Sequence, residues 1–101
     1  MQNISCQEFQ KMRDNKEQYM LIDVREQDEW NSGHFEEAIN IPTGKIQAEF
    51  ENVVPDKNAK VVLHCARGSR SKLACTFLEM RGYTNLYNLE GGYLGYCENV
   101  K

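Results

Sequence analysis

The sequence lacks the features that would place the protein in a membrane, outside the cell or on nucleic acid. No hydrophobic run approaches the roughly 18 residues of a membrane-spanning helix. The first residues, MQNISCQEFQKMRD, contain neither the basic start nor the apolar block of a secretory signal. The formal net charge is -3, which argues against nucleic acid as a partner of the whole surface. We therefore expect a cytoplasmic protein that binds neither membranes nor nucleic acids.

The few cysteines and histidines are not spaced as metal ligands. No two cysteines form a C-x-x-C pair, and the two histidines are far apart in the sequence. Disulfides are rare in proteins without an export signal. We therefore expect free thiols and no bound metal. The residues concerned are Cys6, Cys65, Cys75 and Cys97, with His34 and His64.

The chain is short and moderately hydrophobic. Its 101 residues suit a single domain spanning residues 1–101, and 41% of them are hydrophobic. A chain of this size buries roughly 60–68% of its unfolded surface, which is enough for one modest core. The composition therefore predicts one folded domain.

Short hydrophobic runs alternate with segments of helical character along the chain. Runs typical of strands occupy residues 19–24, 38–41, 60–64 and 86–89. Helical spacing or capping signals occupy residues 5–15, 26–32, 45–52 and a segment ending before Gly82. This alternation predicts an α/β fold, with a mostly parallel central sheet flanked by helices on both faces. Reactive groups of such sheets lie at the carboxyl ends of the strands.

Two of these helices carry more specific signals. Ser5 and Glu8 have the spacing of a capping box, which would begin the first helix. The helix before Gly82 has apolar residues at helical spacing, and we expect them, together with Cys75, to pack in the core. This apolar face comprises Leu73, Ala74, Phe77, Leu78 and Met80.

The stretch VLHCARGSRSKLA, residues 62–74, places Cys65 where a buried strand gives way to a helix. A thiol with the ordinary pKa of about 8.5 is mostly protonated at neutral pH and is a poor nucleophile. Unpaired N–H groups at the start of a helix favour the thiolate, and a glycine lets the loop curl around the sulfur. We expect Cys65 to be a catalytic nucleophile, with Arg67 and Arg70 attracting an anionic substrate. The predicted substrate-binding loop comprises Ala66, Arg67, Gly68, Ser69, Arg70 and Ser71.

Charged and polar residues near this loop are expected to support it. Asp23 and Arg25 end a neighbouring strand, and we expect an ion pair between them that braces the loop. His64 precedes Cys65 on the strand, so its side chain should point away from the sulfur and form structural hydrogen bonds. We expect His34 to be a loop residue bonded to the local backbone.

Four segments of the chain resemble the rhodanese family and occur in the family's order. They are LIDVRE (21–26), GHFEEAINIP (33–42), the loop with Cys65, Gly68, Arg70 and Ser71, and LEGGY (89–93). The resemblance implies a sulfurtransferase without metal or organic cofactor. Cys65 would take sulfur from an anionic donor such as thiosulfate and become a persulfide. The acceptor would be cyanide or a thiol, such as glutathione or thioredoxin.

Two positions depart from the pattern of the family. Glu36 and Glu37 stand where a glycine usually precedes Ala38, which predicts a strained or reshaped turn. Tyr96 stands where a tryptophan is common.

Other functions stay open at this point. Tyrosine-type phosphatases and related arsenate reductases place five residues between cysteine and arginine, whereas four separate Cys65 from Arg70. The shorter loop suits a single sulfur atom better than a phosphoryl group. A non-catalytic rhodanese-like binding module is a further alternative, although such modules usually lack the cysteine. Cys65 could also be an ordinary buried thiol.

Overall fold

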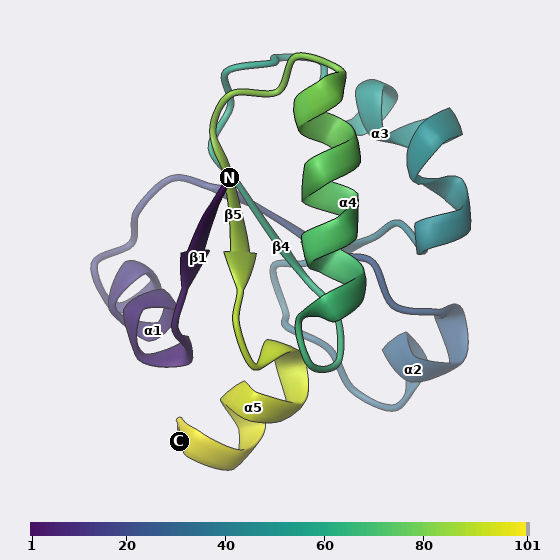
Figure 1. Ribbon diagram of the computed structural model, residues 1–101. Helices are drawn as coiled ribbons and strands as arrows, with labels where there is room; N and C mark the ends of the chain where they lie inside the picture. Colours follow the sequence, from purple (N-terminus) through teal and green to yellow (C-terminus); the bar gives the residue numbers. More distant parts are fainter. Residues whose placement is uncertain (101) are drawn as a thin grey trace.

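A computed structural model describes residues 1–100 of the chain, and its centre is a five-stranded sheet (Figure 1). The strand order is β1-β5-β4-β2-β3, and every neighbouring pair is parallel. The strands are β1 (Gln2–Ile4), β2 (Met20–Asp23), β3 (Ile39–Asn40), β4 (Val61–His64) and β5 (Leu86–Leu89). The predicted α/β fold with a parallel sheet is confirmed.

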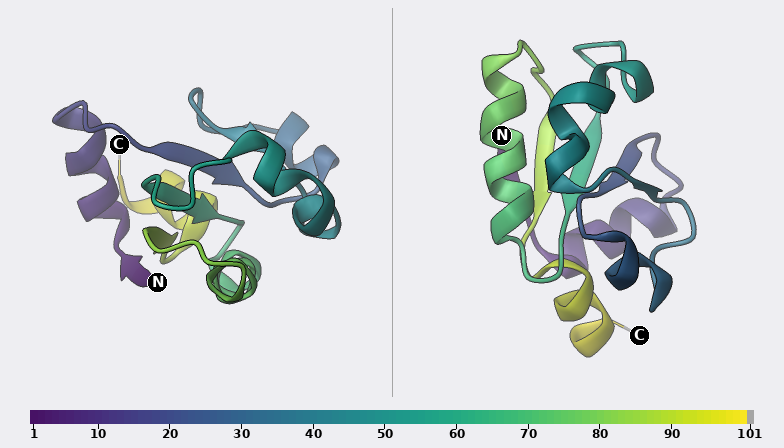
Figure 2. Two further views of the ribbon diagram at one scale, coloured as in Figure 1. Left: turned by 90° about the horizontal axis from the view of Figure 1, so that it is seen from above. Right: turned by 90° about the vertical axis from the view of Figure 1, so that its right-hand side faces the viewer.

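Helices cover both faces of this sheet (Figure 2). They are α1 (Cys6–Asp14), α2 (Gln27–Asn31), α3 (Ile46–Val53), α4 (Ser69–Met80) and α5 (Gly92–Asn99), with a short 3-10 helix, η1 (Thr43–Lys45), before α3. One core cluster joins the sheet to α3 and α4, and a second joins the opposite face to α1. Val61 and Leu63 belong to the first cluster and Val62 to the second, because successive side chains of a strand point to opposite faces.

The first helix begins as its capping signal predicts. The Ser5 hydroxyl accepts a 3.0 Å hydrogen bond from the Glu8 amide, and the Glu8 carboxylate accepts a 2.8 Å bond from the Ser5 amide. The helix buries Phe9 and Met12 against the sheet and ends before Asn15. The predicted capping box is confirmed.

Two elements, β1 and α5, were not predicted, and the buried face of α4 differs from the prediction. The strand β1 was not expected, because its three residues carry no hydrophobic alternation. The segment after Gly91 is a helix, α5. In α4 the expected core face is wrong for Leu73 and Met80, which are 72% and 82% exposed. The buried stripe of α4 instead follows Ser71, Ala74, Cys75 and Leu78 at helical spacing, whereas Leu73 and Met80 lie on the solvent side.

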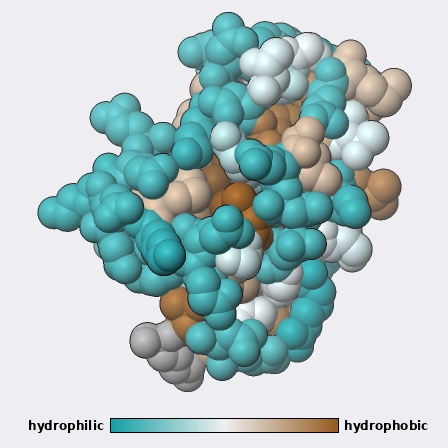
Figure 3. All heavy atoms as spheres, turned by 60° about the vertical axis from the view of Figure 1, so that its left-hand side comes forward, coloured by the Kyte–Doolittle hydropathy of each residue, from teal (hydrophilic) through white to brown (hydrophobic). Residues whose placement is uncertain are grey.

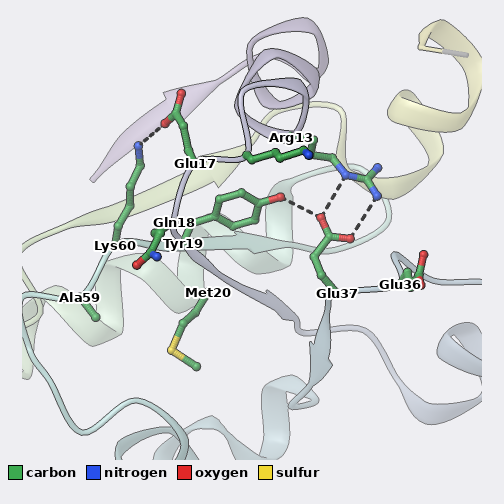
Figure 4. A pocket seen from close by; sticks show the side chains of 10 residues that line it. Arg13, Glu17, Gln18, Tyr19, Met20, Glu36, Glu37, Ala59 and Lys60 are labelled. Atoms are coloured by element: carbon green, nitrogen blue, oxygen red, sulfur yellow. Dashed lines mark hydrogen bonds and ion pairs between the residues drawn. The ribbon is translucent and has the colours of Figure 1, made fainter.

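The Glu36-Glu37 turn is formed without backbone strain. Neither glutamate has a positive φ; Lys16 is the one non-glycine residue among positions 1–100 that does. The Glu37 carboxylate pairs with Arg13 at 3.0 Å and accepts a 2.7 Å hydrogen bond from the hydroxyl of Tyr19 (Figure 4). The turn is therefore tied to α1.

The α1 side of the molecule is mostly hydrophilic, with small separate hydrophobic areas (Figure 3). An open hollow of about 930 Å³ lies at the amino ends of β2 and β4, and Lys60, Met20 and Tyr19 are among the residues that line it (Figure 4). Cys65 follows the carboxyl end of β4, so this hollow is at the opposite end of the sheet from the predicted site. No helix formed by residues 1–100 is both long and apolar enough to span a membrane.

Candidate active site

The loop after β4 wraps around the sulfur of Cys65. Cys65 follows the last residue of β4, and α4 begins four positions later at Ser69. The backbone N–H of Gly68 donates a 3.0 Å hydrogen bond to Sγ of Cys65. Gly68 has φ +105°, a conformation that residues with side chains rarely adopt. The predicted role of this glycine in turning the loop toward the sulfur therefore matches its geometry.

The helix α5 holds the outer side of the loop, and in Figure 1 it lies beside the turn that leads into α4. Its first amides donate to loop carbonyls: Tyr93 N–H to the Cys65 oxygen at 2.9 Å, and Leu94 N–H to the Ala66 oxygen at 3.0 Å. These carbonyls are thus directed away from the sulfur, and the amides that follow them are free to turn inward.

The loop favours the thiolate of Cys65. Burial alone would raise the pKa of this thiol, since Cys65 is only 1% exposed. Hydrogen bonds from the Ser71 hydroxyl, 3.5 Å from the sulfur, and from the amides of Ser71, Gly68 and Arg67 outweigh burial and bring the pKa below its ordinary value. The sulfur is therefore a candidate nucleophile shielded from water.

Two other cysteines show the opposite behaviour. Burial raises the pKa of Cys75 to about 12, and burial also raises the pKa of Cys6. Both are buried free thiols. Cys75 is the packed side chain that its place in α4 predicts.

Each loop arginine is paired with a glutamate from outside the loop. The guanidinium of Arg70 makes a two-pronged pair with Glu29 of α2, at 2.7 and 2.9 Å. Arg67 makes the same kind of pair with Glu98 of α5, at 2.9 and 2.8 Å. Neither glutamate could be paired with its arginine from the sequence, because the partners lie 41 and 31 residues apart along the chain.

A buried asparagine also supports the loop and was missed. Asn88 of β5 is 2% exposed, and its amide nitrogen lies 3.3 Å from the Gly68 carbonyl and 3.1 Å from the Asn3 side chain. Its side-chain oxygen lies 2.5 Å from the Ser71 hydroxyl oxygen, so Asn88 competes with the Cys65 sulfur for the single proton of that hydroxyl. The signal was present: a polar residue in the middle of the buried run LYNL.

The expected ion pair of Asp23 and Arg25 is confirmed. Arg25 Nη2 lies 2.9 Å from the Asp23 carboxylate, and both side chains are almost fully buried. The same nitrogen donates to the Gly33 carbonyl at 2.7 Å, and the guanidinium lies 4.5 Å from the ring centre of Tyr93. The pair therefore connects the end of β2 with α5 and, through α5, with the reactive loop.

His34 is bonded to the local backbone as predicted. The hydrogen bonding predicted for His64 is met only in part, because its Nδ1 lies 3.3 Å from the Cys65 carbonyl oxygen while its buried Nε2 has no hydrogen-bond partner in the described part of the chain. His64 is fully buried, and burial lowers its pKa to about 4 even though the charge of Asp23 opposes this. Its ring contacts the ring of Phe35 edge-on. His34 bonds the Trp30 carbonyl at 2.8 Å and stacks on the Trp30 ring. Among residues 1–100, no three His, Cys, Asp or Glu side chains gather as metal ligands.

Comparison with known proteins decides the family. A model of the rhodanese-like domain matches residues 5–99, almost the whole chain. The chain belongs to the rhodanese-like domain family. Solved rhodanese-like structures agree: a rhodanese-related protein from Thermoplasma volcanium is 28% identical, with a TM-score of 0.84, and the match covers 99% of this chain and 94% of that one. A human single-domain sulfurtransferase, 24% identical, shares the fold with a TM-score of 0.85 over 100% of this chain and 99% of its own.

Curated relatives of this rhodanese-like domain are longer proteins. The tRNA uridine(34) hydroxylase of Sodalis glossinidius is 32% identical, in a match that covers 83% of this chain and 25% of that protein. The protein of the same name from Buchnera aphidicola (strain Bp) is 28% identical, over 97% of this chain and 32% of its own length. The chain thus spans between a quarter and a third of these relatives.

Proposed function

We propose that the protein is a sulfurtransferase in which Cys65 carries the transferred sulfur as a persulfide. The observation that supports this most directly is the hydrogen bond from Gly68 N–H to the Cys65 sulfur. Amides in this arrangement stabilise a sulfur anion, whether it is the thiolate or the terminal sulfur of a persulfide. The proposed partners are a small anionic donor and a thiol acceptor, either a small molecule or a protein such as thioredoxin.

The reaction consists of two displacements. The Cys65 thiolate attacks the outer sulfur of thiosulfate, the sulfur–sulfur bond of the donor breaks, and sulfite leaves with the electron pair. The acceptor thiolate then attacks the outer sulfur of the persulfide and leaves as a persulfide itself, which regenerates the Cys65 thiolate. Electrons balance in each step, so the chemistry requires neither metal nor organic cofactor.

The support of the loop explains how the cysteine is activated. The amides of Arg67, Gly68 and Ser71 lower the pKa of Cys65 against the effect of burial. Four residues separate Cys65 from Arg70, and this short loop leaves less room for a tetrahedral phosphoryl group than the five-residue loop of a phosphatase. Sulfur transfer is therefore favoured over phosphate-ester hydrolysis.

A second candidate comes from the names of the curated relatives. We infer a role within the hydroxylation of uridine 34 in tRNA, because a relative from Hamiltonella defensa that is 33% identical is named for that reaction. The chain covers only 24% of that relative, so the proposal concerns the rhodanese-like part of such an enzyme. This second proposal is tested by incubating the chain with unmodified tRNA and measuring hydroxylated uridine at position 34.

Intact mass spectrometry after incubation with thiosulfate tests the sulfurtransferase. We expect the mass of one sulfur atom on Cys65, lost again on addition of a thiol. Cys65→Ser should prevent the addition while the circular dichroism spectrum stays unchanged, and Cys75→Ser, a second buried cysteine, should leave the addition intact. Thiosulfate that adds no mass, or adds the same mass to Cys65→Ser, contradicts the proposal. A generic phosphate ester assayed in parallel should not be hydrolysed.

A further inference from the structure

The surroundings of the Cys65 loop carry less net positive charge than the two arginines of the loop indicate. Two arginines, Arg67 and Arg70, follow Cys65 in the loop, and two glutamates, Glu98 and Glu29, bind them. These four side chains sum to zero charge. Seen from distances longer than the ion pairs themselves, the electrostatic attraction that the arginines would exert on an anionic donor is therefore largely cancelled.

The two pairs differ in exposure. Arg67 and Glu98 are 57% and 55% exposed, so water and salt screen their interaction. Arg70 and Glu29 are 36% and 31% exposed. The Cys65 thiolate adds to the effect of Glu29 in raising the pKa of Arg70, whereas Glu98 alone raises the pKa of Arg67. The pair of Arg70 with Glu29 is therefore the one that bears on the substrate.

Glu29 is held in place independently of Arg70. Its Oε1 accepts a 3.0 Å hydrogen bond from the backbone N–H of Glu26, which fixes the carboxylate at the start of α2. Hydrogen bonds from Arg70 lower the pKa of Glu29 to about 2, so the carboxylate is charged throughout the neutral range. A doubly charged sulfur donor must therefore compete with the fixed carboxylate of Glu29 for the two terminal nitrogens of Arg70, Nη1 and Nη2.

We propose that Glu29 is a specificity-determining residue that disfavours doubly charged sulfur donors, so that the site is matched to donors with one negative charge. This inference rests on the proposed sulfurtransferase function. Singly charged sulfane donors include organic thiosulfonates and organic persulfides. Each gives its outer sulfur to Cys65 and releases a sulfinate or a thiolate with the electron pair, so the balance is that of the thiosulfate reaction.

Two donors that differ in charge test the proposal, namely thiosulfate, with two negative charges, and methanethiosulfonate, with one. Steady-state kinetics with a thiol acceptor should be measured for the unchanged protein, for Glu29→Gln and for Glu98→Gln. Glutamine keeps the shape of the side chain and removes the charge. We expect Glu29→Gln to raise kcat/KM for thiosulfate by about tenfold, mainly through KM, and for methanethiosulfonate by less than about threefold. Glu98→Gln, the matched control on the more exposed pair, should change the ratio of the two donors by less than about twofold.

Equal changes for both donors in Glu29→Gln, or a loss of thiosulfate activity, would overturn the proposal, because Glu29 would then only position Arg70. Intact mass separates this failure from failure of the proposed function. If both donors add sulfur to Cys65 but the donor ratio is unchanged in Glu29→Gln, only the specificity role is wrong. If neither donor adds sulfur to Cys65, the sulfurtransferase and the role of Glu29 are both wrong.

Discussion

The backbone amide of Tyr93 donates a 2.9 Å hydrogen bond to the carbonyl oxygen of Cys65 and so joins the helix α5 to the reactive loop. The approach is possible because residue 92 is a glycine. A Cβ at this position would lie 2.5 Å from the carbonyl oxygens of both Cys65 and Ala66. The loop therefore owes its shape to a helix that contributes no side chain to the sulfur.

Substitution of Gly92 by alanine should disrupt this contact. Gly92 has φ +62° as well as no space for a Cβ, so we expect Gly92→Ala to lower the free energy of unfolding by about 2 kcal/mol or more. The control is Gly44→Ala, since a Cβ there would meet no atom within 4 Å, and it should change stability by less than about 0.5 kcal/mol. Urea denaturation measures the free energy of unfolding of both variants. Equal values would show that the close approach of Gly92 to the Cys65 and Ala66 carbonyls does not matter for stability.

Removal of the Ser71 hydroxyl should make Cys65 less reactive at neutral pH. The hydroxyl helps to lower the pKa of Cys65, so Ser71→Ala should raise that pKa and reduce the rate of alkylation at pH 7 by roughly three- to tenfold. The midpoint of the rate against pH should move upward. Ser69→Ala, on the exposed side of the same helix, should not shift it. An unchanged midpoint in Ser71→Ala would mean that the backbone amides alone set the pKa.

Protonation of His64 should make the protein less stable in mild acid. Its pKa is about 4 in the folded protein against 6.5 for the ordinary group. The unfolded chain therefore binds a proton that the folded protein does not, and stability is lost as the pH falls from 6.5 toward 4. Between pH 6.5 and 4.5 this amounts to roughly 2 kcal/mol.

Denaturation with urea at several pH values checks the effect of His64. The contribution of Glu29, whose pKa is lowered from 4.5, is lost only below that value, so the window above pH 4.5 isolates the histidine. In His64→Gln the slope of stability against pH in this window should be much smaller. An unchanged slope would assign it to another group.

Substitutions in α4 should follow the observed burial and not the apolar sequence pattern. Leu78 is 1% exposed and Met80 is 82% exposed. We expect Leu78→Ala to cost about 2–5 kcal/mol of stability, since it leaves a cavity in the core. Met80→Ala should change stability by less than about 0.5 kcal/mol, because the side chain is already in water. Thermal or urea unfolding measures the stability of the two variants. Similar losses of stability would contradict the observed burial and support the core face predicted from the sequence.

Local patterns in the sequence were sufficient for the framework of the fold. The continuous apolar runs of β2 and β4 and the capping box of α1 each depend on neighbouring residues only. The cysteine loop was also predictable, because its position after a buried strand and its glycine are local features. The strand β1 was not, since its pairing with β5 is made more than eighty residues away and its own sequence is polar.

The electrostatics of the site depend on pairings that no local pattern reveals. Arg67 and Arg70 were expected to attract an anion, and the structure shows each of them bound to a carboxylate from α5 or α2. The apolar face of α4 was misjudged because apolar residues fall on both sides of the helix, and only packing against β4 and β5 decides which side is buried.

The dependence of the loop on α5 has a consequence for synthesis of the chain. Translation proceeds from the N-terminus, so residue 65 leaves the ribosome well before residues 93 and 94, whose amides secure its loop. Until those residues arrive, β4 also lacks its partner β5, and the nascent thiol has the acidity of an unfolded cysteine. The low pKa of Cys65 is thus reached only after β5 and α5 have packed against its loop.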